Sequence, residues 1–368
     1  MRRSRPSRRR PRDGPTPAIV RHGGPMYLRN CWYVAAWSRD VGDMPVGRIV
    51  LDEPVVLYRK ADGSIVALED RCAHRHAPLH CGRVLGSDIQ CGYHGLVFNE
   101  EGVCTKVPGQ TATPLQARVR KYRALERYAF VWIWMGDPDL ADPDVIPDFA
   151  RMSDPTFAPT GAVNHVRAHY ELLNDNLLDL SHVGYVHCST IGTPEMGEKA
   201  TVRTERTEHG IRVTRWVIDC APPPTHVRSG IFRQGHRVDR WQIIDFLPPS
   251  FIQIHVGSAK TGTGAPEGNR VGGLGMWIMN AMTPETPVST NYYWVVARDF
   301  QVHSPETTRL IFNEITTAFE EDKQILEAQQ RSIELFAGPS SVNIPADAGG
   351  IQARRLLRTL IETQLAPA

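Results

Sequence analysis

Residues 72–94 read CAHRHAPLHCGRVLGSDIQCGYH, and this stretch decides the fold of the first third of the chain. It holds two pairs of one cysteine and one histidine, Cys72 with His74 and Cys91 with His94. Glycines between and after the pairs permit the tight backbone that a buried centre needs around it. Apolar, β-rich segments flank the motif at residues 48–70 and 128–136. We therefore expect two loops at the tip of a small β domain, which bring four ligands to one centre.

Two kinds of metal centre use two cysteines and two histidines. Zinc sites usually pair like with like, as Cys-x2-4-Cys and His-x3-5-His. Here each pair is mixed, which is the ligand set of a Rieske [2Fe–2S] cluster, with two cysteines on one iron and two histidines on the other. The spacing therefore predicts a Rieske cluster held by Cys72, His74, Cys91 and His94.

The composition is that of a globular protein of two or more domains. The chain has 368 residues, of which 41% are hydrophobic and 22% charged, and a net charge of +2. No run of eighteen apolar residues is present, so we expect no membrane span. The seven cysteines are an odd number and no apolar leader precedes them, which favours a reducing cytoplasm over a disulfide scaffold.

The first 25 residues differ from the rest. They carry eight arginines and one aspartate, a net charge of +7, which leaves −5 for residues 26–368. Arginine, proline and glycine without aromatic residues cannot form a core, so we expect a disordered basic arm. The alternative is an arm that binds an acidic partner or nucleic acid.

A Pro- and Asp-rich stretch at residues 136–149 interrupts the β pattern and marks a domain boundary. We expect a Rieske domain at residues 26–140 and a second domain at residues 150–368. Strands of the second domain are expected within residues 240–259, 273–282 and 290–300, which are rich in β-branched and aromatic residues.

A second candidate site lies in residues 169–192, whose leucines indicate a buried helical segment. Asp179 and His182 are three residues apart and would share one helical face. His182 and His187 are five apart, about 140° around an ideal helix, so they converge only if the helix ends or distorts near Gly184. Asn176 stands three residues before Asp179 in the same segment.

A third ligand is expected from residues 312–331. Helical spacing places Asp322 on the same apolar face as Phe312, Ile315, Phe319 and Leu326. Glu320 and Glu321 lie outside this face and are expected in solvent. Two histidines and a carboxylate form the facial triad of non-haem Fe(II) oxygenases. The sequence therefore predicts mononuclear iron at His182, His187 and Asp322. The alternative is an aspartate that caps or bridges a helix interface.

These segments together resemble the vanillate O-demethylase oxygenase group of Rieske non-haem iron oxygenases. The resemblance rests on MYLRNCWYVAAWSRDV (26–41), the Rieske motif, NLLDLSHVGYVH (176–187) and EEDKQILEAQQR (320–331). It implies an α+β protein, with an all-β Rieske domain followed by a helix-grip domain, an antiparallel sheet wrapped on a long helix. It also implies a head-to-tail homotrimer, in which Asp179 bridges His182 to a cluster histidine of the neighbouring subunit, His74 or His94.

The resemblance further implies an O2-dependent oxidoreductase that receives electrons from NAD(P)H through a separate reductase. We expect it to hydroxylate or O-demethylate a small aromatic compound, such as a methoxylated aromatic acid. Ring or methyl hydroxylation and N-demethylation are alternatives on the same iron. A different class would be a Rieske electron carrier fused to a binding domain. By position, substrate contacts fall at Gln242, Asn280 and Asn313, although the residue types do not all match those of the family.

Overall fold

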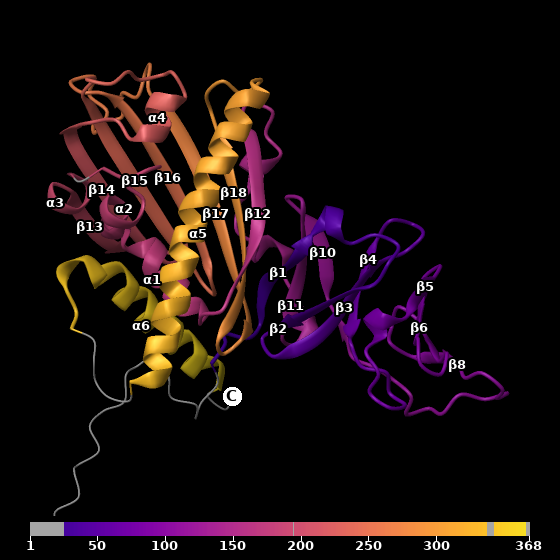
Figure 1. The fold of residues 1–368 in the computed structure, drawn as a ribbon. Coiled ribbons are helices and arrows are strands. Elements are labelled where there is room, and N and C mark those ends of the chain that lie inside the picture. Colours follow the sequence, from indigo (N-terminus) through magenta and orange to yellow (C-terminus); the bar gives the residue numbers. More distant parts are fainter. Residues whose placement is uncertain (1–25, 194, 337–341, 366–368) are drawn as a thin grey trace, which may run out of the picture.

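A computed structural model describes residues 26–193, 195–336 and 342–365 of the chain. The predicted basic arm, residues 1–25, lies outside the described residues. Figure 1 shows an N-terminal β unit on the right, and on the left a large sheet with helices in front of it.

The N-terminal unit consists of three small antiparallel sheets. The first has the strand order β1 (Cys31–Trp37), β11 (Phe130–Met135), β10 (Ala124–Arg127). The second has the order β2 (Val46–Val50), β3 (Glu53–Arg59), β4 (Ile65–Glu69), β9 (Lys121–Tyr122). The third, which carries the Cys–His loops, has the order β5 (Arg83–Leu85), β6 (Asp88–Gln90), β7 (Val97–Phe98), β8 (Cys104–Lys106).

The second unit is built on one seven-stranded antiparallel sheet. Its order is β12 (Ala158–Val166), β18 (Ser289–Arg298), β17 (Leu274–Thr286), β16 (Phe251–Lys260), β15 (Val238–Leu247), β14 (Ile211–Cys220), β13 (Thr201–Arg206). The strands expected between residues 240 and 300 are all present. Since successive side chains of a strand point to opposite faces, β16, β17 and β18 contribute alternate residues to two different cores.

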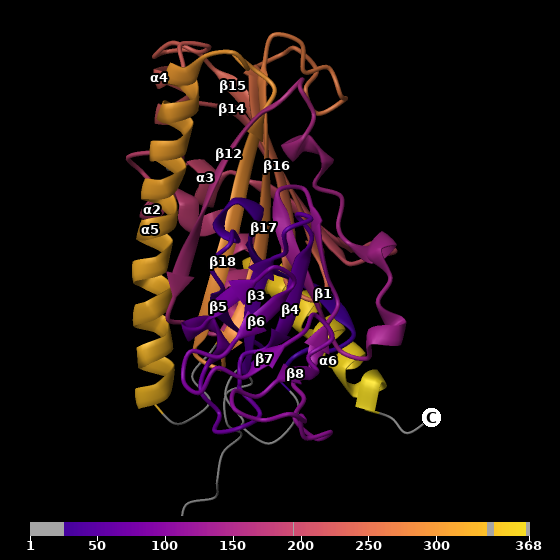
Figure 2. The same ribbon diagram turned by 90° about the vertical axis from the view of Figure 1, so that its right-hand side faces the viewer.

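Helices cover one face of this sheet. They are α1 (Tyr170–Leu178), α2 (Val183–Val186), α3 (Glu195–Glu198), α4 (Pro224–Arg228), α5 (Pro305–Leu335) and α6 (Ala348–Leu365). Short 3-10 helices occupy Ser38–Asp40, Leu79–Cys81, Pro138–Leu140, Pro143–Val145, Ala150–Met152, Leu180–His182 and Pro345–Asp347. The long helix α5 begins where Ser304 caps the backbone N–H of Thr307 and Pro305 takes the first helical position. In Figure 2, α5 runs along the side of the sheet.

The two faces of the sheet have different partners. Ile244, Ile254 and Ile278 on the inner face pack in one core with Ile315 and Phe319 of α5. The outer face packs against the sheet of β1, β10 and β11 through a second, aromatic-rich core, which includes Trp32, Trp132, Phe251, Tyr293 and Val295. This arrangement confirms the expected α+β fold, in which an antiparallel sheet wraps on a long helix.

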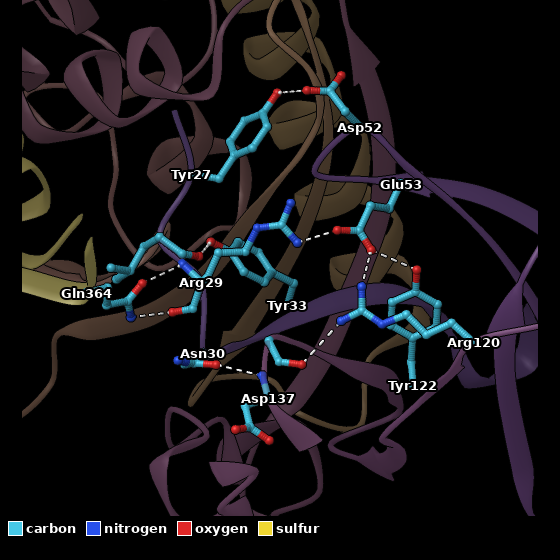
Figure 3. Close-up of polar contacts among 12 residues, drawn as sticks. Tyr27, Arg29, Asn30, Tyr33, Asp52, Glu53, Arg120, Tyr122, Asp137 and Gln364 are labelled. Atoms are coloured by element: carbon cyan, nitrogen blue, oxygen red, sulfur yellow. Dashed lines mark hydrogen bonds and ion pairs between the residues drawn. The ribbon is translucent and has the colours of Figure 1, made fainter. Parts of the chain in front are cut away.

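Polar contacts near the N-terminus connect the two units (Figure 3). Glu53 accepts hydrogen bonds from Tyr122 (2.7 Å) and Arg120 (3.0 Å) and is paired with Arg29. The backbone N–H of Arg29 donates to Gln364 Oε1 of α6 at 2.9 Å. The segment that precedes β1 thus joins the last helix of the second unit to the first residue of β3 in the N-terminal unit.

Within the described residues, no helix combines the length and the apolar character needed to cross a membrane.

Candidate metal centres and cavity

The helical segment predicted at residues 169–192 is broken in the structure. Helix α1 ends at Leu178, and Asp179 has an extended backbone (φ −118°, ψ 93°) before the 3-10 helix that ends at His182. The short helix α2 follows and ends before His187. These changes of direction bring the rings of His182 and His187 to a centroid distance of 5.3 Å. The expected distortion near Gly184 is present, because the 3-10 helix gives way to α2 at Val183 and α2 ends at Val186. The two histidines therefore converge. The additional break at Asp179 was not expected.

Asp322 of α5 completes a cluster with these histidines. Its Oδ1 lies 3.1 Å from His187 Nε2 and 3.4 Å from His182 Nε2. One ligand atom of each residue lies within 4.8 Å of the others, and Asp322 is only 6% exposed. The structure thus brings together the three residues that the sequence singled out.

The outer nitrogen of each ring has its own partner. His182 Nδ1 donates to the backbone oxygen of Asp179 at 2.7 Å, and His187 Nδ1 lies 2.7 Å from Glu321 Oε2. Because a carbonyl oxygen can only accept, the Nδ1 of His182 carries a hydrogen, and in the neutral ring the Nε2 is then the nitrogen that can bind a metal. Metal-ligating histidines usually have such a carbonyl or carboxylate behind them. Two Nε2 atoms and a carboxylate oxygen directed at one point fit an Fe(II) ion.

The electrostatics of the cluster also suit a cation. Burial alone would raise the pKa of Asp322, but its hydrogen bonds with His182 and His187 outweigh burial and hold the pKa at about 2. Burial alone would likewise lower the pKa of His187, whereas its contacts with Asp322 and Glu321 raise it. Asp322 is therefore an ionised carboxylate inside the protein, and such a group requires a positive partner.

Glu321 is a site residue that the sequence-based interpretation missed. It was expected in solvent beside Glu320, and Glu320 is indeed exposed. Glu321 instead turns to His187, a residue 134 positions earlier in the chain. The helical stripe could not reveal this contact, since the stripe describes one face of α5 and His187 approaches from beside that face.

Asn176 and Asp179 lie close to the cluster in different ways. The Nδ2 of Asn176 donates to Asp322 Oδ1 at 3.0 Å and so holds that carboxylate in place. The carboxylate of Asp179 accepts from Ser181 N (2.9 Å) and Ser181 Oγ (3.0 Å) and lies 3.6 Å from Arg215 Nη1. Asp179 and His182 do not meet across one helical face, because the helix has ended at Leu178; only the backbone oxygen of Asp179 contacts His182.

A cavity adjoins the cluster, between α1, α2 and α5 and the inner face of the sheet. Most of its wall is apolar, and it includes Leu177, Val183, Ile254, Met276, Ile278 and Phe319. Polar groups enter it at Asn176, His226, Arg240 and Gln242, beside the three clustered residues. A small organic molecule with a polar substituent fits a site of this kind.

Of the three expected substrate contacts, only Gln242 lines the cavity. Asn280 is fully buried, donates to the backbone oxygens of Ile252 and Ile278, and accepts from Tyr292. Its hydrogen-bonding groups are therefore used within the fold. Asn313 is exposed on α5. Neither asparagine reaches the cavity, so we do not extend the substrate assignment to them.

The four residues of the opening motif also lie together. Cys72 and Cys91 are 1% and 2% exposed, and their thiols interact, whereas His74 and His94 are exposed with ring centroids 4.7 Å apart. The loops that carry them follow β4 and β6. Two buried sulfurs beneath two exposed imidazoles fit a [2Fe–2S] cluster with its histidine-bound iron toward the surface.

Comparison with known proteins assigns both units. Residues 31–123 match the Rieske [2Fe-2S] domain, and residues 166–363 match the vanillate O-demethylase oxygenase C-terminal domain. The chain belongs to the vanillate O-demethylase oxygenase family. It is thus the oxygenase component of a Rieske non-haem iron oxygenase, an oxidoreductase whose cofactors are a Rieske cluster and a mononuclear iron.

Several family members resemble most of the chain. The iron–sulfur subunit of a toluene-4-sulfonate monooxygenase system from Comamonas testosteroni is 39% identical over 92% of this chain and 98% of its own length. A vanillate O-demethylase oxygenase subunit from a Pseudomonas species is 36% identical over 92% of this chain and 96% of its own. The crystal structure of dicamba monooxygenase bound to 3,6-dichlorosalicylic acid superposes with a TM-score of 0.86 at 32% identity, and covers 93% of this chain and 99% of that one.

Proposed function

We propose that this oxygenase inserts one oxygen atom of O2 into a methyl C–H bond of a small aromatic acid, and that O-demethylation of a methoxylated aromatic acid is its main reaction. The observation that carries the proposal is the cluster of His182, His187 and Asp322, which opens onto an apolar cavity with a few polar groups. Relatives named for vanillate, dicamba and toluene-4-sulfonate, which are all aromatic acids, support the substrate class.

We assign the [2Fe–2S] cluster to Cys72, His74, Cys91 and His94, and the mononuclear iron to His182, His187 and Asp322. When bound, the iron supplies the activation of O2, and the cluster supplies electrons one at a time. The protein's own contribution is to hold the ligands. Glu321 and the backbone of Asp179 fix the orientation of the two imidazoles, and Asn176 fixes the carboxylate of Asp322.

The cavity wall selects and places the substrate. Leucine, isoleucine and phenylalanine side chains exclude water and accept an aromatic ring, while Gln242 offers a hydrogen bond from β15. Hydroxylation of an O-methyl carbon gives a hemiacetal, which breaks down to a phenol and formaldehyde. The overall reaction consumes one O2, two electrons and two protons and also releases one water.

The electrons come from a separate NAD(P)H-dependent reductase and pass between subunits. In Figure 1 the loops of β5–β8 lie at the far end of the molecule from α2. His74 and His94 are exposed, so the cluster can face another subunit. We therefore propose a cytoplasmic head-to-tail homotrimer, in which Asp179, with a carboxylate side chain 22% exposed, joins His182 to a cluster histidine of the neighbour.

Reconstitution with a reductase and NADH tests the proposed reaction. Methoxylated benzoates are supplied one at a time, and formaldehyde, phenol and O2 uptake are measured together. Formaldehyde in equal amount to the phenol supports O-demethylation. A benzylic alcohol from a methylated aromatic acid, with no formaldehyde from any methoxylated one, would assign methyl hydroxylation instead. Transfer of electrons with no oxygenated product from any aromatic compound would leave only the electron-carrier function.

A further inference from the structure

The inner face of β14 and β15 carries three polar side chains among apolar ones. Arg240 and Gln242 lie on the same face of β15 as the core residues Ile244 and Phe246, and Arg215 lies directly opposite Gln242 on β14. All three are at most 6% exposed. Burying a guanidinium or an amide among apolar side chains costs free energy unless the group finds a partner. We therefore ask what each of the three side chains contacts.

The two arginines differ in whether a carboxylate lies beside the guanidinium. Arg215 Nη1 lies 3.6 Å from a carboxylate oxygen of Asp179. Arg240 donates to the backbone oxygen of Ile191 at 3.1 Å and makes a long contact of 3.4 Å with Thr193 Oγ1. Both of these partners are uncharged, and no carboxylate of the described residues lies within 4.0 Å of Arg240. Burial lowers the pKa of Arg240 to about 10, which still leaves it charged at neutral pH.

Another buried arginine shows what a purely structural role looks like. Arg298 also lacks a carboxylate, but it donates to three backbone oxygens, those of Ala158, Gln301 and Ser304, and it does not line the cavity. Arg240 has only one such oxygen and lines the cavity beside the metal cluster. Its positive charge is therefore available to a molecule in the cavity.

Arg215 determines which end of Gln242 faces that molecule. The Nε of Arg215 donates to Gln242 Oε1 at 3.1 Å, and because arginine has no acceptor, the amide oxygen must be the atom on that side. The amide NH2 of Gln242 is left with two donor hydrogens, and no hydrogen bond within the described residues uses them. Since Arg240 and Gln242 both line the cavity, the polar side chains of β15 present hydrogen-bond donors to it.

We propose that Arg240, with the amide of Gln242, forms the subsite that binds the anionic group of the substrate, a carboxylate or a sulfonate. A guanidinium fork matches the paired oxygens of either group. The anion would supply a counter-charge in direct contact with Arg240, whereas Glu195 of the protein acts on Arg240 only from beyond 4.0 Å. The cavity then binds a molecule with its anionic end at β15 and its reacting carbon at the cluster. This inference rests on the proposed function, because it identifies which part of an aromatic acid is recognised.

The test compares the affinity of the protein for two aromatic anions and for one neutral amide. Iron-loaded protein is titrated anaerobically, without reductase, with 4-methoxybenzoate, toluene-4-sulfonate and 4-methoxybenzamide, and affinity is measured by calorimetry. We expect the wild type to prefer one of the two anions over the amide by about tenfold or more. The tighter of the two identifies the anion. Equal affinity for the amide and both anions would overturn the subsite.

Substitutions assign the preference to a residue. Arg240→Met should remove most of the preference while the amide binds within about twofold of the wild type, and Arg240→Lys should keep part of it, because it retains the charge but not the fork. Arg151→Met is the matched control, because it removes a guanidinium that lies 4.8 Å from the ring of Trp277 and does not line the cavity. An unchanged preference in Arg240→Met would exclude the proposal. If that variant does not fold, Gln242→Leu must reduce the preference, and failure to do so would also overturn it.

The outcomes separate this inference from the proposed function. Preferential binding of an anion that is never oxygenated would leave the subsite intact and reject the reaction. Formaldehyde formation with the same anion preference in Arg240→Met and the wild type would keep the reaction and reject the subsite.

Discussion

Glu321 Oε2 lies 2.7 Å from His187 Nδ1, so a carboxylate stands directly behind one of the proposed iron ligands. His187 is 1% exposed, and its other nitrogen faces Asp322 at 3.1 Å. The ring is therefore held between two acids, one of which also faces the metal position. This contact makes His187 a more basic and better-oriented ligand than an isolated imidazole.

Substitution of Glu321 tests this relationship. Glu321→Gln keeps an acceptor near His187 Nδ1 but removes the charge, so we expect mononuclear iron to bind about 10- to 100-fold more weakly. The measurement is the iron retained after dialysis against a graded chelator, with the Rieske absorption as an internal reference. Glu320→Gln, at an exposed neighbouring position, is the control. Equal iron retention in both variants would show that Glu321 does not support the site.

Asp179 is expected to affect electron transfer more than metal content. Asp179→Asn removes the charge but preserves the shape of the group that accepts from Ser181. Both metal centres should load normally, because only the backbone oxygen of Asp179 contacts His182. We expect the reduced Rieske absorption to be reoxidised by O2 and substrate at least about tenfold more slowly in a single turnover. A rate near that of the wild type would remove Asp179 from the electron path.

Glu53 gives a prediction for the pH dependence of stability. Burial alone would raise its pKa, but hydrogen bonds from Tyr122 and Arg29 outweigh burial and lower it (Figure 3). A carboxylate with a lowered pKa stabilises the fold above its unfolded pKa, and this contribution is lost as the pH falls through the folded pKa. Glu53→Gln should therefore cost about 1 kcal/mol in the free energy of unfolding near pH 7, and the difference should shrink as the pH falls below about 4.5.

Thermal or urea unfolding of the wild type and Glu53→Gln across pH 3.5 to 7, where unfolding is reversible, provides the comparison. A stability difference that stays constant over this range would mean that the Glu53 charge does not contribute.

Local sequence patterns identified the elements and the candidate ligands, because both depend on short-range spacing. The mixed Cys–His pairs, the alternation in residues 240–300 and the helical stripe around Asp322 can each be recognised within one segment. Contacts between distant segments could not be predicted in this way. Glu321 reaches His187 only because α5 packs beside α2, and the buried position of Arg240 depends on which face of β15 is turned inward.

Asn280 shows the same limitation, because its position in the sequence suggested a substrate contact but did not reveal its partners in the fold. Asn280 lies on the inner face with Ile278 and Met282, but its amide is already hydrogen-bonded to Tyr292 and to the backbone of β16 and is not free for a substrate.

The break at Asp179 also depends on a contact that the leucine pattern does not show. The Asp179 side chain accepts from Ser181 N, and this local contact competes with continuation of the helix.

The metal content of the purified protein tests the central claim most directly. Iron and acid-labile sulfide are measured per chain in the wild type and in Asp322→Ala, both reconstituted in the same way. The two-centre assignment predicts three irons and two sulfides in the wild type, and two irons, two sulfides and an unchanged Rieske spectrum in Asp322→Ala. Two irons in the wild type, or three in the variant, would contradict an iron held by His182, His187 and Asp322.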